Sequence, residues 1–150
     1  MQIIINLLFI FLILVLQGLL GWASLPLIIT ILLALKKDKL QLIVYSFLIG
    51  FLQDVFLAAG FVHTLTLTLT GALAGYLTEI FSWEPDQLSI LLAVILTPVA
   101  HGLNSLIGLL FYGHKFQPDV FFMNLLWATL LNLVLAPLFY LVYRRFIRNE

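Results

Sequence analysis

The sequence predicts an all-α polytopic membrane protein, folded as a single integral membrane domain over residues 1–150. Two observations lead to this prediction. Hydrophobic residues make up 63% of the chain and charged residues 9%, with a mean hydropathy of +1.17, whereas soluble domains are about 45–50% apolar and about 25% charged. The few charges also divide the chain into apolar runs, most of them close to the roughly 17–25 residues of a spanning helix. Any function must therefore take place in or at the bilayer.

About six transmembrane helices are expected. The first, Ile3–Leu20, lacks the basic start and cleavage site of a signal peptide, so we expect the chain to retain it. The second, Leu25–Leu35, follows a Ser-Leu-Pro start signal and is short, reaching about 16 Å at 1.5 Å per residue, half of a roughly 30 Å hydrocarbon core. It is either a short helix whose Lys36 and Lys37 reach outward, or a half-helix that enters and returns.

The other four helices are separated by clear turn signals. A short Ala-Ala-Gly connection ends at Gly60, and two longer polar loops, residues 82–86 and 112–119, each contain Pro and an aromatic residue. These breaks predict helices at Leu40–Ala59, Phe61–Phe81, Leu88–Phe111 and Val120–Tyr143.

Basic residues in the short loops predict the orientation. With six crossings, all but one of them fall on the same side, which the positive-inside rule assigns to the cytoplasm. Both termini of this inner-membrane-type protein would then be cytoplasmic, whereas a re-entrant second segment would move the N-terminus outside. The residues on the cytoplasmic side are Lys36, Lys37, Lys39, Arg144, Arg145 and Arg148, and Lys115 lies on the other side.

Composition and missing motifs exclude several functions. A net charge of zero provides no polybasic surface, so nucleic acid is not an expected partner. The absence of cysteine rules out disulfides and thiolate chemistry. HExxH, GxGxxG, P-loop and GxSxG motifs are also missing, and the three histidines lie far apart in the sequence. We predict no catalytic residues, no cofactor and no metal.

Asp54 is the first residue that needs an explanation. It lies in the apolar run YSFLIGFLQDVFL, and the nearest basic residues are Lys39 and Lys115. A charged aspartate costs about 2.5–3.5 kcal/mol at the centre of a membrane helix, so it needs a partner, water, a proton or a place near the interface. Near the outer end of the third helix, we expect it to accept hydrogen bonds from the start of the next helix, at the Gly60 and Phe61 amides. A proton or ion relay is the alternative.

Other polar residues are expected to join helices. His101 and Asn104 share one face of the fifth helix, and Asn132 lies at a similar depth on the sixth. Interhelical bonds of this kind contribute about 0.6 kcal/mol each in measured cases.

The fourth helix begins with alternating threonines. Strict alternation resembles a strand, but an isolated strand cannot span a bilayer, so we expect a helix. Its Gly71 and Gly75 form a GxxxG face, which favours close packing within the protein over dimerisation.

Taken together, these features resemble the bacterial rod shape-determining MreD family over nearly the whole chain. The most specific element is the G-x-x-x-D pattern from Gly50 to Asp54. Around it the resemblance includes Pro26-Leu27-Ile28, Gly60-Phe61, Gly71 to Tyr76, Phe116-Gln117-Pro118-Asp119-Val120-Phe121, Asn132, Ala136-Pro137-Leu138 and a basic tail.

The resemblance implies a non-enzymatic scaffold in the bacterial inner membrane, part of the cell-elongation machinery. Its direct partner would be the single-span protein MreC, with MreB and the peptidoglycan polymerase and transpeptidase pair as indirect partners. The implied fold is that of the substrate-capture subunits of energy-coupling-factor transporters. An alternative function is a small-molecule capture subunit of a transporter, with a pocket near Asp54, His63 and Asn104. The candidate structural or partner-contact residues are Asp54, Gly50, Gly60, Gly71, Gly75, His101, Asn104 and Asn132.

Overall fold

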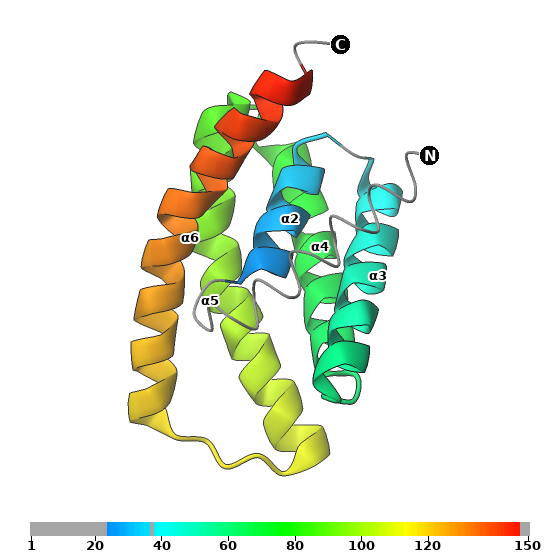
Figure 1. Cartoon of the computed structure of the whole chain (residues 1–150), viewed down its shortest axis with the longest axis vertical. Coiled ribbons are helices and arrows are strands. Elements are labelled where there is room, and N and C mark those ends of the chain that lie inside the picture. Colours follow the sequence, from blue (N-terminus) through cyan, green and yellow to red (C-terminus); the bar gives the residue numbers. More distant parts are fainter. Residues whose placement is uncertain (1–23, 37, 148–150) are drawn as a thin grey trace.

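The computed structural model describes residues 24–36 and 38–147, and the regular structure in these ranges is entirely α-helical (Figure 1). The predicted first helix lies outside them, so the count of six helices remains a prediction. The predicted third helix extends two residues too far, because Ala58 adopts a left-handed conformation that ends the helix at Leu57. The helices are α2 (Leu25–Ala34), α3 (Lys39–Leu57), α4 (Val62–Ile80), α5 (Pro85–Tyr112) and α6 (Pro118–Ile147).

The short helix α2 forms the centre of the bundle. It contacts all four of the other described helices, which surround it in Figure 1. Leu27, Ile28 and Ile31 are each at most 1% exposed. The ten residues of α2 reach only about 15 Å, so this helix does not span a bilayer by itself. Whether the chain crosses or returns here depends on the residues before Ser24, outside the described part.

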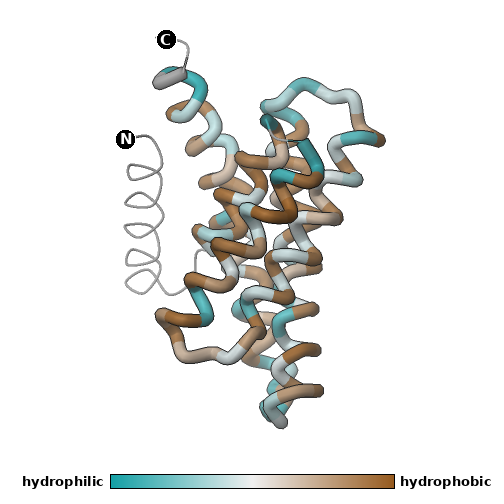
Figure 2. Tube along the Cα trace, turned by 90° about the vertical axis from the view of Figure 1, so that its right-hand side faces the viewer, coloured by the Kyte–Doolittle hydropathy of each residue, from teal (hydrophilic) through white to brown (hydrophobic). Residues whose placement is uncertain are grey.

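Helices α3 to α6 run alternately down and up in Figure 1. Three of the described helices, α3, α5 and α6, are long and apolar enough to cross a membrane, judged by length and composition alone. Helix α4 has the same length as α3, 19 residues, but it is less apolar because of its threonines. Large hydrophobic side chains such as Phe111 and Phe122 are exposed, and hydrophobic residues continue along the helices in Figure 2. Exposed apolar surface of this extent suits contact with lipid.

Charged side chains cluster at one end of the bundle. The Lys39 ammonium group lies 3.2 Å from the Glu79 carboxylate and links the start of α3 to the end of α4. The Arg144 guanidinium group lies 3.6 Å from the Asp86 carboxylate and links the end of α6 to the start of α5. Both pairs are exposed, so each contributes at most about 1 kcal/mol. Lys115 lies in the loop at the opposite end, between α5 and α6 (Figure 1).

Two glycines allow α3 and α4 to approach closely. A Cβ atom on Gly71 would lie 2.7 Å from the Cβ of Ser46, and one on Gly75 would lie 3.0 Å from the Cγ of Lys39. The first distance is shorter than real carbon contacts, so only glycine fits. The GxxxG face of α4 is therefore occupied by α3 within the same chain.

The threonine hydroxyls of α4 bond mainly to their own helix. The hydroxyls of Thr68 and Thr70 each donate to the carbonyl four residues earlier, at 2.6 Å. This back-bonding satisfies a polar group without a partner from another helix. The alternating threonines are thus compatible with a helix in an apolar environment.

Gly71→Ala should destabilise the protein by about 1–3 kcal/mol, because the added methyl group overlaps Ser46. The double variant Ser46→Gly, Gly71→Ala should recover most of this loss. Gly102→Ala is the matched control, because a Cβ there meets nothing within 4 Å. Unfolding midpoints in detergent compare the three variants. Equal midpoints for Gly71→Ala and Gly102→Ala would show that the two helices are not packed this closely.

Candidate functional site

Asp54 is buried at the end of α3 and accepts four polar contacts from the first turn of α4. Its Oδ1 atom accepts a bond from the His63 amide at 2.9 Å and lies 2.8 Å from the His63 Nδ1 atom. Its Oδ2 atom accepts bonds from the Thr64 amide at 2.7 Å and the Thr64 hydroxyl at 2.6 Å. The side chain is only 2% exposed. Both carboxylate oxygens are therefore engaged by backbone N–H donors.

These contacts make Asp54 the cap of α4. A helix leaves its first amides unpaired, and a capping side chain normally accepts from the second or third of them. The capping position of α4 is Phe61, which has no side-chain acceptor, and His63 and Thr64 are the second and third helical residues. Asp54 supplies the missing acceptor from α3, and its negative charge suits the positive end of the helix dipole.

The expected amides, those of Gly60 and Phe61, are not the ones that Asp54 binds. The helix begins at Val62, one residue later than expected, and a capping acceptor binds the second and third helical amides, which lie beyond the start of the helix. The acceptor therefore reaches His63 and Thr64, further into the first turn.

Close packing accounts for Gly50, the glycine of the G-x-x-x-D pattern. It lies one helical turn before Asp54, on the same side of α3. A Cβ atom on Gly50 would lie 2.6 Å from the His63 carbonyl oxygen and 2.7 Å from the Thr64 Cα atom. Because both neighbours are backbone atoms, a side chain could not be accommodated by a simple rotamer change. Gly50 thus brings α3 against the turn that Asp54 caps.

Tyr112 fixes the connection between α3 and α4. Gly60 adopts a φ of +68°, and a Cβ atom there would overlap the Tyr112 ring. The Tyr112 hydroxyl accepts a 2.9 Å hydrogen bond from the Phe61 amide, another unpaired amide at the start of α4. Tyr112 ends α5, so it ties three helices together. This role was not predictable from the sequence, in which Tyr112 has the position of an interfacial aromatic residue.

Asn132 joins α6 to α5. Its amide nitrogen donates to the Thr97 hydroxyl at 3.1 Å, and both residues are fully buried. The Thr97 hydroxyl in turn donates to the Ala93 carbonyl at 2.7 Å. The Asn132 Oδ1 atom is buried with no partner in the described part of the chain.

His101 and Asn104 lie together in a polar pocket between α5 and α6, with His114 and Lys115 from the connecting loop. Asp54 and His63 do not line it. The structure therefore separates the residues that the capture-subunit hypothesis places in one cavity. Asp54 and His63 lie together at the start of α4, whereas Asn104 lines the pocket between α5 and α6.

The carboxylate, imidazole and hydroxyl around Asp54 have the composition of a catalytic triad but not its geometry. In a triad the hydroxyl bonds to the imidazole, which the carboxylate orients. Here the Thr64 hydroxyl donates to the carboxylate itself and Thr64 is only 3% exposed. Within the described ranges, no group of three metal-ligating side chains occurs. The arrangement around Asp54 is suited to holding a helix end.

The stability lost on substituting Asp54 should increase with the number of acceptor oxygens removed. Asp54→Asn keeps one oxygen but places an NH₂ group against one of the two amides, so we expect a loss of about 1–3 kcal/mol, the cost of one unpaired buried donor. Asp54→Leu leaves both amides unpaired and should lose more. Unfolding in detergent measures the order, with the exposed Glu79→Gln as a control that should change little. Equal losses for Asn and Leu would indicate a requirement for charge instead.

The comparisons with known proteins give one result for the family. The family model described as rod shape-determining protein MreD matches residues 24–148, which is most of the chain. No curated protein and no solved structure matches it. The match includes the G-x-x-x-D pattern, the GxxxG face, the polar pocket and Asn132. The chain belongs to the MreD family of rod shape-determining proteins.

Proposed function

We propose that this protein is a non-enzymatic scaffold of the bacterial inner membrane, which binds the single-span protein MreC and thereby supports peptidoglycan synthesis and rod shape. MreB and the polymerase and transpeptidase pair would be reached through MreC. Membership in the MreD family is the observation that carries this proposal, because it implies a role in determining rod shape.

The use of polar groups in the structure supports a scaffold. Asp54 and Thr64 are committed to the end of α4, and Asn132 to the contact with Thr97. What remains on the surface of α3, α5 and α6 is mostly apolar and suits lipid or a partner helix. Helices in membranes associate through close packing and a few polar contacts, without a hydrophobic driving force.

Helix α6 offers the most open surface for such a partner. Its buried residues, spaced four apart, form a single stripe toward the rest of the bundle. The other faces carry exposed side chains such as Trp127 and Val134. We place the MreC helix on these faces of α6. The residues of the buried stripe are Ala128, Asn132, Ala136 and Tyr140.

The distribution of charge supports a cytoplasmic C-terminus. Lys36, Lys39, Arg144 and Arg145 lie at one end of the bundle and Lys115 at the other. By the positive-inside rule the first end faces the cytoplasm. A cytoplasmic N-terminus requires one crossing before Ser24 and a second one at α2, and these six helices would match the number in the capture-subunit fold.

The capture-subunit alternative has less support. The hypothesis places Asp54 and His63 in one pocket with Asn104, but neither Asp54 nor His63 lines the pocket between α5 and α6.

Deleting the gene from a rod-shaped host should make the cells round, and the wild-type gene should restore rods. The protein should also co-purify with MreC, and a bulky polar residue on the open face of α6, as in Val134→Gln, should weaken this complex. Val55→Gln, on the exposed face of α3, is the matched control. Rod-shaped deletion cells, or equal loss of MreC with both variants, would contradict the proposal.

The orientation can be tested with single cysteines, since the native chain has none. A cysteine replacing Glu84 should be shielded from a membrane-impermeant thiol reagent in spheroplasts, and one replacing Lys115 should react. Both residues are exposed, so burial does not account for a difference. The reverse labelling pattern would invert the topology.

A further inference from the structure

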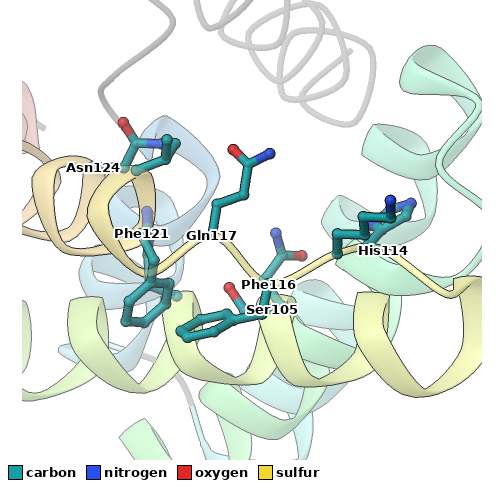
Figure 3. A pocket seen from close by; sticks show the side chains of 10 residues that line it. Ser105, His114, Phe116, Gln117, Phe121 and Asn124 are labelled. Carbon is teal, nitrogen blue, oxygen red and sulfur yellow. The ribbon is translucent and has the colours of Figure 1, made fainter.

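An open polar pocket lies between the second half of α5, the start of α6 and the loop that joins them. It has a volume of about 290 Å³, and its lining is mostly polar in a region where the neighbouring surfaces are apolar. Figure 3 shows Gln117 and Asn124 extending to the same side, with Phe116, Phe121 and Ser105 beneath them. The lining residues are His101, Asn104, Ser105, His114, Lys115, Phe116, Gln117, Val120, Phe121 and Asn124.

The charges around the pocket favour an anion. Lys115 is the one permanently charged side chain in the described lining, and no carboxylate is part of it. The side-chain amides of Gln117 and Asn124 can each donate two hydrogen bonds beside it. An ammonium group with neighbouring amide donors matches the oxygens of a phosphate.

Asn104 offers the ligand a hydrogen-bond acceptor. Its Oδ1 atom is buried and has no hydrogen-bond partner in the described part of the chain. A buried acceptor of this kind costs about 1–3 kcal/mol unless a donor reaches it. A ligand that carries a hydroxyl group as well as a phosphate would satisfy both Asn104 and Lys115.

The surroundings of the pocket indicate that this ligand has apolar chains. The Phe116 and Phe121 rings lie 5.3 Å apart in its wall, and Phe116 and Val120 are each about half exposed. Exposed Phe122 and Leu126 continue the apolar surface along α6. The pocket lies at the loop end of the bundle, opposite the cluster of basic residues (Figure 1), where lipid head groups meet a membrane protein. Its volume suits a head group, with the acyl chains left against α6.

We propose that this pocket binds the glycerophosphate head group of an anionic phospholipid, such as phosphatidylglycerol, in the leaflet that contacts the α5–α6 loop. Lys115 pairs with the phosphate, Gln117 and Asn124 donate to its oxygens, and the Asn104 carbonyl accepts from a glycerol hydroxyl. The head-group contacts do not involve Trp127 or Val134, the α6 residues on which the MreC contact is proposed.

Native mass spectrometry of the purified protein, titrated with phosphatidylglycerol or with phosphatidylcholine of the same chains, tests this assignment. We expect phosphatidylglycerol to be retained on the order of tenfold more tightly, as a charge-assisted contact predicts. Lys115→Ala and Gln117→Ala, both in an exposed loop, should reduce this preference severalfold without lowering the unfolding midpoint. Lys36→Ala removes the same charge at the other end of the bundle and should preserve the preference.

Three results would overturn the proposal. The first is equal retention of the two lipids. The second is an equal effect of Lys36→Ala and Lys115→Ala, which would indicate only general attraction between charges. The third is displacement of the lipid by soluble glycerol 3-phosphate at equal concentration, which would assign the pocket to a soluble phosphate ester. Failure of glycerol 3-phosphate to compete supports the lipid.

Discussion

The capping of α4 by Asp54 is the interaction on which the arrangement of the helices depends. The first amides of a helix have no partner within the helix, and where a neighbouring helix buries them, water cannot satisfy them either. Here the two carboxylate oxygens of a residue on α3 take up the His63 and Thr64 amides. Because the carboxylate is short, α3 and α4 must lie close together at this end. The cap therefore fixes the distance and the register of the helix pair at once.

Several other residues make this cap possible. Gly50 removes the side chain that would hold α3 away from the His63 backbone, and Gly71 does the same further along the pair at Ser46. Tyr112 takes up the Phe61 amide and anchors the connecting turn to α5. The small residues and the single buried acid thus serve one purpose, which is to start α4 at a defined place in an apolar surrounding.

The remaining polar groups fall into two classes. The Thr68 and Thr70 hydroxyls and the Asn132 amide nitrogen donate within or between helices, so these groups rigidify the bundle. The polar groups at the loop between α5 and α6 instead line an open pocket, where the Asn104 oxygen is left without a partner in the described chain. Other buried polar atoms, such as the Asn132 Oδ1, also lack a partner in the described chain, but of these only Asn104 lines the pocket, where a ligand could reach it. The apolar faces of α6 are available to a partner helix by the same reasoning.

Helix positions and the pairing of Asp54 with the start of the next helix were predictable because both follow from local rules. Apolar runs bounded by Pro and Gly place α2 to α6 within a few residues, and an isolated acid in such a run requires a partner. The specific amides were not predictable, because they depend on how α3 packs against the first turn of α4, which brings Asp54 to the second and third helical residues. The roles of Tyr112 and Ser46 depend on contacts between distant segments. Spacing placed His101 and Asn104 on one face, but gave no sign that the loop around Lys115 folds over them.

Hydrogen exchange at individual amides of α4 tests the central claim most directly. In the wild-type protein, the His63 and Thr64 amides should exchange slowly although they begin a helix. In Asp54→Leu they should exchange on the order of ten- to a hundredfold faster, as expected for the loss of a bond worth about 1–3 kcal/mol, while the amide of Leu73 in the middle of α4 stays protected. Unchanged protection of His63 and Thr64 would contradict the account, because it would show that the start of α4 does not depend on Asp54.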